Sequence, residues 1–342
     1  MNPTTTSRFY KLCLSTLVAV YFLIWVGGVV RSTGSGMGCP DWPTCFGKFV
    51  PPTTVSELPE NYREQYSAYR DKKNQKFARY LSLIGLQETA KKIVEDKSIL
   101  SEAEFNATKT WMEYANRLAG VTIGMLIIAL FVVSWSTRQD KPLLFKGSLA
   151  LLILVVFQGW FGSIVVSTNL TAWTITVHMF LAVLMVVLLV WLMVRSGQQE
   201  GIEGRSIRIW LIINLAGLAV QIFLGTRVRE TLDRLAVSLS REAWIANAGT
   251  DFIIHRTFSW AILALQLVLW IKLRKTSTKK SLTLPPLLLI LGSVLTGGGM
   301  SWFGVPPLLQ PFHLLMAVVS FGWLYHLYLR TGMQPSTVNE LK

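Results

Sequence analysis

Three of the four histidines in this chain stand at matching places in long apolar segments. His178, His255 and His313 each lie a few residues inside such a segment, close to its first end. Histidine is a frequent axial ligand of haem iron, and two imidazoles on facing helices can hold one haem between them. We therefore expect His255 and His313 to form such a pair. The alternative is two buried histidines that bond to the backbone or to each other.

A fourth apolar segment carries Asn116 where the other three carry histidine. Arg117 follows it directly, as Arg256 follows His255. Polar side chains are costly within a membrane, so each of them needs a partner. A haem has two propionates, and arginines can pair with such groups in a bidentate manner. The sequence therefore predicts Arg117 and Arg256 as cofactor-binding residues, with snorkelling toward the membrane surface as the alternative.

These residues need membrane helices to position them, and the composition favours such helices. Of the 342 residues, 51% are hydrophobic and only 15% are charged, which is a low charge for a soluble domain. A helix needs about 20 apolar residues to cross a bilayer. Eight segments approach this length, at about 9–31, 110–135, 146–167, 172–195, 207–226, 251–272, 285–303 and 307–330. We predict an all-α membrane protein with eight transmembrane helices.

The charge pattern indicates how the chain is oriented. The net charge is +14, and much of it lies at the start of the chain and in the short loops after every even-numbered segment. Because short basic loops stay in the cytoplasm, we expect both termini there and a multi-pass protein of the bacterial cytoplasmic (inner) membrane. Membrane lipid is thus an expected partner. Nucleic acid is not, because its binding needs the basic charge gathered on a soluble face.

The eight segments divide into two similar sets of four. WVGGVVR at 25–31 ends the first segment and resembles FLGTRVR at 223–229, which ends the fifth. Repeats of this even-numbered kind have parallel topology. We predict two parallel-repeated four-helix bundles, an N-terminal unit at 1–200 and a C-terminal unit at 201–342. The first unit carries a long outer loop at 32–109.

The long outer loop contains two further features. Cys39 and Cys45 lie close together just after the first segment. The outer side of a bacterial membrane is oxidising, so we expect a disulfide that closes a short loop, with a redox-active pair as the alternative. Farther along, residues 59–96 predict amphipathic helix. This insertion is either a lid or partner surface, or a solvated excursion.

Several motifs resemble those of the haem A synthase family. They are GGVVRSTGSGMGCPDWPTCFG at 27–47, EYANR at 113–117, QGWFGSIVVSTNL at 158–170, VH at 177–178, HR at 255–256 and QPFHL at 310–314. The motifs fall at the ends of the predicted segments and in the family's order. The resemblance covers all eight segments and is weakest in residues 50–108.

The resemblance implies that the protein oxidises the C8 methyl group of haem O to a formyl group, giving haem A for cytochrome oxidase. It implies a haem b between His255 and His313 and a substrate haem O in the first half. The family's proposed catalytic carboxylate falls on Glu113, and its outer cysteine pair falls on Cys39 and Cys45.

Two departures from the family bear on the mechanism. The family usually has histidine in place of Asn116, and it often has a second cysteine pair, which residues 226–250 lack. Asparagine is a poor iron ligand, so we expect His178 to hold the substrate from one side while Asn116 faces an open site. Glu113, one turn away, would relay protons or orient the methyl group; its alternative role is an ion pair with Arg117. The bis-histidine unit would relay electrons.

Three other functions fit part of the pattern. A membrane haem b electron-transfer protein of the quinol oxidoreductase type explains the histidines but gives Glu113 no role. A thiol–disulfide oxidoreductase explains only Cys39 and Cys45, and a transporter explains only the repeat. For the synthase, the candidate partners are haem O, haem O synthase as its source and a second copy of the chain. The sequence indicates no electron donor.

Overall fold

The protein is a bundle of long helices. The computed structural model describes residues 3–197, 199–276 and 278–333, and within these ranges it contains no β-strand. Eight helices are long and apolar enough to cross a membrane, which confirms the eight predicted segments. They are α1 (Pro3–Ser32), α4 (Ala107–Trp135), α5 (Pro142–Ser167), α6 (Ala172–Ser196), α7 (Arg205–Leu235), α9 (Gly249–Leu273), α11 (Pro285–Trp302) and α12 (Leu309–Arg330).

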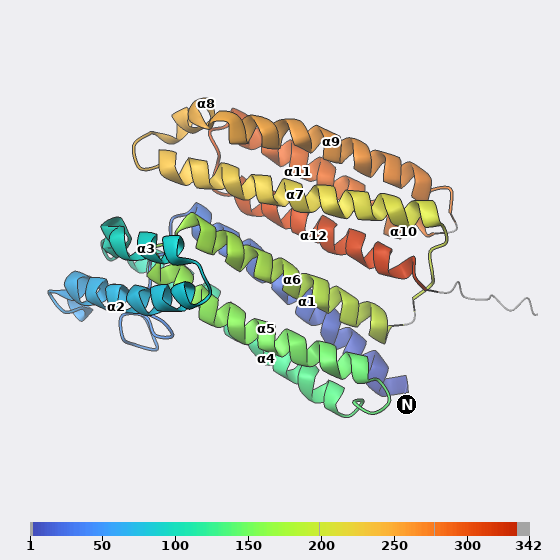
Figure 1. The fold of residues 1–342 in the computed structure, drawn as a ribbon, viewed down its shortest axis with the longest axis horizontal. Helices are drawn as coiled ribbons and strands as arrows, with labels where there is room; N and C mark the ends of the chain where they lie inside the picture. The colour runs from blue at the N-terminus through green and yellow to red at the C-terminus, as the bar shows by residue number, and fades with distance from the viewer. Residues whose placement is uncertain (1–2, 198, 277, 334–342) are drawn as a thin grey trace, which may run out of the picture.

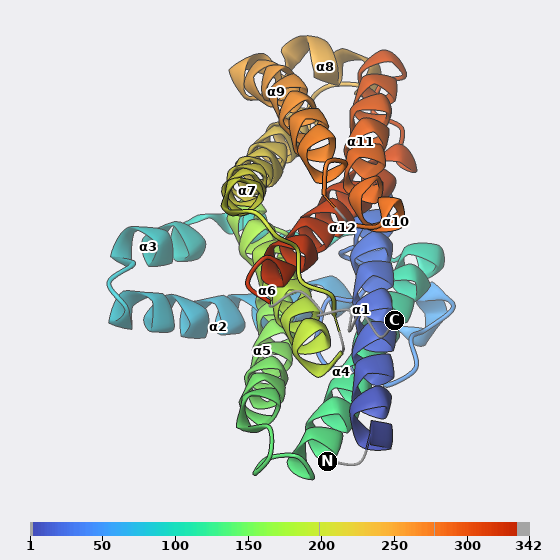
Figure 2. The same cartoon turned by 90° about the vertical axis from the view of Figure 1, so that its right-hand side faces the viewer.

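The eight helices pack as two rings of four (Figures 1 and 2). In the first ring, α1, α4, α5 and α6 each contact the next, and α6 closes the ring against α1. In the second, α7, α9, α11 and α12 contact one another in the same order, and α12 closes against α7. Helix α12 also packs on α1 and α6, so it lies at the junction of the rings. The repeat symmetry of the two predicted units stays a prediction.

The loops are distributed unequally between the two ends of the bundle (Figure 1). One end, called here the basic end, carries the segments 136–141, 197–204 and 274–284. The first and last of these hold lysines and arginines, and the last includes the short helix α10 (Lys280–Thr283). The opposite end, called the lid end, carries residues 33–106. Helix α1 begins and α12 ends at the basic end. The predicted cytoplasmic location of the termini concerns residues 1–2 and 334–342, which lie outside the described residues.

The predicted insertion at 59–96 is helical, as expected, but the predicted amphipathic pattern is present in its second helix and weak in its first. It forms α2 (Tyr62–Leu83) and α3 (Gln87–Glu95). Helix α2 is docked on the first ring: Phe77 stacks on Trp173 with ring centres 6.2 Å apart. The Asn74 side-chain amide donates to the carbonyl oxygen of Ser167 at 2.8 Å. The insertion therefore covers the ends of α5 and α6 and is called the lid below.

A buried ion pair fastens the lid to residues 99–102, which follow it in the chain. Arg70 of α2 donates to the carboxylate of Glu102 at 2.6 Å and to the carbonyl oxygens of Ile99 and Ser101 at 3.1 and 2.9 Å. The side chains of Arg70 and Glu102 are 0% and 3% exposed. Burial raises the pKa of the Glu102 carboxyl and lowers the pKa of the Arg70 guanidinium. Each charge is thus costly in this place unless the other is present.

The substitution Glu102→Gln should loosen the lid, because it leaves the Arg70 charge buried without a counter-charge. Removing one partner of a buried pair costs about 3–5 kcal/mol. Hydrogen exchange of residues 62–95 should become faster than in the wild type. Glu104→Gln is a matched control, since Glu104 also pairs with an arginine but is 87% exposed. Equal exchange in the two variants would contradict a structural role for the buried pair.

Candidate functional site

The second four-helix ring brings two imidazoles next to each other in an edge-on arrangement. His255 of α9 and His313 of α12 have ring centres 6.1 Å apart and planes inclined by 67°. A metal–imidazole bond is about 2 Å long and the ring centre lies roughly 1 Å behind the nitrogen, so two axial imidazoles hold their centres about 6 Å apart. The observed spacing fits a pair of axial haem ligands.

Hydrogen bonds select the nitrogen of His313 that can bind metal. The Nδ1–H group of His313 donates to the carbonyl oxygen of Ser293 at 2.8 Å, and the Thr296 hydroxyl lies 3.2 Å from the same nitrogen. A bond of this kind fixes the tautomer and leaves the Nε2 lone pair available to a metal. The Gln221 amide donates to the carbonyl oxygen of His255 at 3.1 Å, while Nδ1 of His255 is buried and has no partner among the described residues.

The first ring presents a single imidazole in similar surroundings. The Gln158 amide donates to the carbonyl oxygen of His178 at 3.0 Å, as Gln221 does to His255. The His178 ring stacks on Phe161, with ring centres 6.5 Å apart. Nδ1 of His178 is buried and lacks a partner in the described part of the chain, and the same holds for Oδ1 of Asn116 on α4. These buried polar atoms need partners from a bound group or from water.

A glycine on the preceding long helix faces each of these imidazoles. A Cβ atom built on Gly162, Gly225 or Gly297 would lie 3.3 Å from the Cε1 atom of His178, His255 or His313, respectively. The absence of a side chain therefore lets each ring lie against helix backbone. The sequence analysis missed these glycines. The signal was the shared spacing of glutamine and glycine in QGWFG at 158–162 and QIFLG at 221–225.

The donor set is suited to haem rather than to a bare metal ion. Among the described residues, no three His, Cys, Asp or Glu side chains gather in a group that could hold a metal ion. A haem needs only one or two protein ligands, because the macrocycle supplies the others. The neighbouring imidazoles of His255 and His313 therefore fit this group. On His178, Nε2 lies 3.3 Å from the Gln158 amide nitrogen, so binding of iron there would replace this contact.

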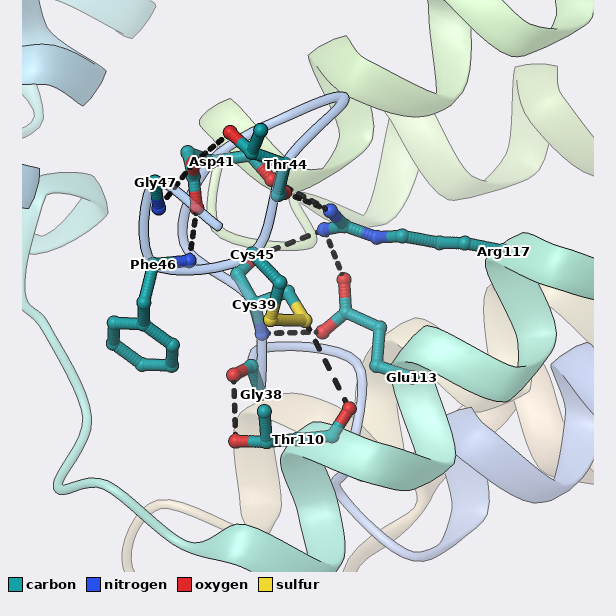
Figure 3. Close-up of a disulfide and its surroundings, with 10 residues drawn as sticks. All are labelled: Gly38, Cys39, Asp41, Thr44, Cys45, Phe46, Gly47, Thr110, Glu113 and Arg117. Atoms are coloured by element: carbon teal, nitrogen blue, oxygen red, sulfur yellow. Dashed lines mark hydrogen bonds and ion pairs between the residues drawn. A yellow bond between two sulfur atoms is a disulfide. The ribbon is translucent and has the colours of Figure 1, made fainter. Parts of the chain in front are cut away.

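A disulfide joins Cys39 and Cys45, as the sequence predicted (Figure 3). The loop that it closes is pressed against the start of α4. The Thr110 hydroxyl donates to the carbonyl oxygen of Gly38 at 2.8 Å, and a Cβ atom on Gly38 would lie 2.6 Å from the Lys109 backbone. Only glycine permits this close approach.

Glu113 and Arg117 clamp the disulfide loop to α4 (Figure 3). The Cys39 N–H donates to the Glu113 carboxylate at 2.9 Å, and Arg117 donates to the other carboxylate oxygen at 2.5 Å. Arg117 also donates to the carbonyl oxygens of Cys39, Asp41 and Thr44 at 2.6–2.9 Å. The ion pair considered above as an alternative is therefore present, and it also anchors the loop. The predicted contact of Arg117 with haem propionates stays a prediction.

The Asp41 carboxylate organises the same loop from within. It accepts the Phe46 N–H at 2.6 Å, the Gly47 N–H at 3.0 Å and the Thr44 hydroxyl. Asp41 is buried, so these donors replace the water that would otherwise solvate its charge. The sequence analysis did not identify this role. Asp41 lies in a loop, where no helical periodicity indicates which groups its side chain contacts.

Two arginines from the two rings share one carboxylate near the lid end. Arg31 of α1 and Arg229 of α7 each pair with Asp233 at 2.7 Å. Arg229 also donates to the side-chain oxygen of Gln310, three residues before His313. The sequence analysis matched the two motifs that end at Arg31 and Arg229, but it did not identify Asp233 as their shared partner. This link fixes α1 to α7 close to the bis-histidine site.

Arg256 differs from Arg117, although both follow a predicted ligand position. It is exposed, and its guanidinium carbon lies 5.5 Å from the ring centre of Phe252. This is the geometry of a cation–π contact at the surface of α9. Its predicted role in cofactor binding stays a prediction.

Comparison with known sequences assigns the chain to a family. A sequence profile of the COX15-CtaA family, described as cytochrome oxidase assembly protein, matches residues 10–82 and 85–325. A heme A synthase of Novosphingobium aromaticivorans is 25% identical over 367 aligned positions, which cover 95% of this chain and 98% of the relative. Heme A synthases of Shewanella oneidensis and Allorhizobium ampelinum are 24% and 26% identical; these matches cover 61% and 65% of this chain and 53% and 57% of the relatives. Because the family profile runs from α1 to α12, the chain belongs to the COX15-CtaA family of cytochrome oxidase assembly proteins.

Proposed function

We propose that the protein is a haem A synthase, which oxidises the C8 methyl group of haem O to a formyl group and so provides haem A for cytochrome oxidase. The observation that carries this proposal is the difference between the two rings. The second ring offers two neighbouring imidazoles, whereas the first offers His178 with Asn116 at the corresponding place. An iron with two imidazole ligands is saturated, while one with a single imidazole keeps an open position.

In the second ring, His255 and His313 would hold a haem b. When bound, this group supplies one-electron transfer. The chain contributes the orientation of its ligands. The carbonyl group of Ser293 fixes the tautomer of His313, and Gly225 and Gly297 allow both rings to lie against helix backbone. Ligands that are fixed in this way need little rearrangement when the iron changes charge.

In the first ring, His178 would hold the iron of the substrate haem O. Phe161 and Gly162 restrict its ring from two sides. The unpaired Oδ1 atom of Asn116 would accept a hydrogen bond from the substrate or from water. The lid covers the ends of α5 and α6 and would restrict the access of water to this ring.

Glu113 lies one helical turn from Asn116 and is buried. Converting a methyl group to a formyl group removes four electrons, which an oxidant such as dioxygen would have to accept. The protons that leave the carbon need an acceptor, and a buried carboxylate near the reacting group can serve as one. The same carboxylate anchors the disulfide loop through Cys39 and Arg117. These two roles, proton acceptor and loop anchor, can be separated by experiment.

We also propose that the basic end faces the cytoplasm of a bacterial cell and the lid end faces the outside. The support is the gathering of lysine and arginine in the loops 136–141 and 274–284. In this orientation the disulfide lies in an oxidising compartment. Haem O would be handed over by haem O synthase within the same membrane.

His255→Ala should abolish the haem b site, because one of its two axial ligands is lost. The electron paramagnetic resonance spectrum of the purified variant should lack the low-spin bis-histidine signal. His178→Ala removes an equally buried imidazole from the other ring and should keep that signal. A low-spin signal that persists in His255→Ala would disprove the assignment of the second ring.

Gly297→Ala should weaken haem b binding roughly tenfold, as changes just outside a ligand shell typically do. The new Cβ atom would press on the His313 ring. Gly298→Ala is a close control, because nothing lies within 4 Å of a Cβ atom there. Both changes raise helix propensity by about 1 kcal/mol, so a difference between them reports the contact with His313. The ratio of haem to protein after purification measures the effect, and equal ratios would contradict the proposed role of the glycine.

Glu113→Gln should lower haem A formation about 100-fold or more if the carboxylate accepts a proton. The variant and wild type are compared in a host that lacks its own synthase but makes haem O. Arg117→Gln removes the other half of the clamp and keeps the carboxylate. We expect it to retain more activity than Glu113→Gln, although hydrogen exchange of residues 39–47 rises in both. Normal haem A yield in Glu113→Gln would refute the catalytic role, and equal losses in both variants would limit Glu113 to anchoring the loop.

A further inference from the structure

A cavity at the basic end lies far from His178, His255 and His313 and has no role in the proposed chemistry. Its volume is about 330 Å³, and it opens where the end of α6, the start of α7 and the end of α12 meet. Figure 2 is viewed from this end of the bundle. The cavity walls combine apolar side chains with Arg195, Arg208 and Tyr328.

The two arginines that line the cavity are not committed to carboxylates. Arg208 lies 5.4 Å from the ring centre of Tyr328 and donates to its hydroxyl at 3.4 Å. Arg195 lies 5.9 Å from the ring centre of Trp191. Within the described residues, neither arginine forms an ion pair, and no Asp or Glu lines the cavity. The wall of the cavity therefore carries two exposed arginines, each beside an aromatic ring.

The arginines of the protein fall into two groups, because some pair with carboxylates while others, such as Arg138 and Arg274, lie over aromatic rings as Arg195 and Arg208 do. Arg31, Arg70, Arg117 and Arg229 all pair with carboxylates of the chain. A single uncommitted arginine at a membrane surface can be explained by snorkelling. Arg195 and Arg208 are different because they come from different rings and line one cavity with a tyrosine hydroxyl. Such a set matches a phosphate group, which accepts several hydrogen bonds and carries negative charge.

We propose that this cavity binds the phosphate of an anionic phospholipid. The cavity lies at the level where a helix bundle meets lipid headgroups, and basic pockets between membrane helices suit such headgroups. The guanidinium groups of Arg195 and Arg208 would contact the phosphate, and the Tyr328 hydroxyl would donate a further hydrogen bond. The apolar wall formed by Leu329 and Met333 would face the glycerol and the start of an acyl chain.

A lipid in this position would connect the two rings. Helix α6 belongs to the first ring and α7 to the second, and only the loop 197–204 joins them along the chain. The single negative charge of a bound phosphodiester would lie between one arginine from each helix. The lipid would thus stabilise the junction on the side opposite to the link between Arg31, Asp233 and Arg229.

The test uses the full-length protein, purified in detergent and stripped of lipid, with phosphatidylglycerol as the probe. Native mass spectrometry measures its binding, and phosphatidylcholine serves as the zwitterionic comparison. R195Q/R208Q should weaken phosphatidylglycerol binding by about 10- to 30-fold, and each single variant by about fivefold, given roughly 1 kcal/mol for each arginine. R195K/R208K keeps both charges and should retain the preference for phosphatidylglycerol.

R138Q/R274Q is the matched control. Arg138 and Arg274 lie at the same end and also lie over tryptophan rings, at 5.3 and 4.7 Å, but neither lines the cavity. The control loses the same charge and should bind phosphatidylglycerol as the wild type does. Equal losses in both double variants would overturn the proposal, because they would show a non-specific effect of charge.

Inorganic phosphate, tested separately by thermal unfolding, distinguishes the source of the group. Phosphate could stabilise the wild type but not R195Q/R208Q while phosphatidylglycerol fails to bind. That result would overturn the lipid assignment in favour of a soluble phosphate. The single variants R195Q and R208Q make the test independent of how well the double variant folds. Unchanged phosphatidylglycerol binding in both single variants would also overturn the proposal.

Discussion

Three imidazole rings lie against the backbone of a neighbouring helix, and this contact fixes the geometry of the candidate site. A Cβ atom at Gly162, Gly225 or Gly297 would already lie 3.3 Å from an imidazole carbon. A larger residue would therefore hold the ring away from the helix and change its distance to the opposite ligand. In a membrane interior no water is available to compensate for such a displacement. Helix packing therefore constrains where the imidazole rings lie.

The two four-helix rings use this packing contact in different ways. The second ring completes a pair of imidazoles, and the Ser293 carbonyl group fixes the tautomer of one of them. The first ring has one imidazole, and a docked lid and a clamped disulfide loop cover its end. Under the proposed function this difference has a simple reason. A resident cofactor needs saturated, fixed ligation, whereas a substrate needs an open position and a protected site that it can enter and leave.

The eight membrane helices could be predicted because apolar length alone decides them. The helical insertion and the disulfide were also predicted correctly, since each depends on residues close in sequence. The glycines behind the imidazoles, Asp233 between Arg31 and Arg229, and the anchoring of the loop by Arg117 were not predicted. Most of these contacts join different helices or loops, and residue type does not indicate the partner. The pair of Arg229 with Asp233 is an exception, because the two residues lie four apart in one helix. The shared spacing of glutamine and glycine at 158–162 and 221–225 is present in the sequence, but only the structure shows that each glutamine bonds to the backbone of a histidine.

The proposed difference between the two four-helix rings predicts which haems the protein binds and which haem it produces. Pigment analysis can test this prediction. The protein is produced together with a source of haem O in a host without its own haem A synthase, and the haems of the membrane are extracted. Pyridine haemochrome spectra then identify each haem type. The account predicts haem A in the extract and haem b bound to the purified protein. Haem b with unconverted haem O and no haem A would contradict it and would identify the protein as an electron-transfer protein.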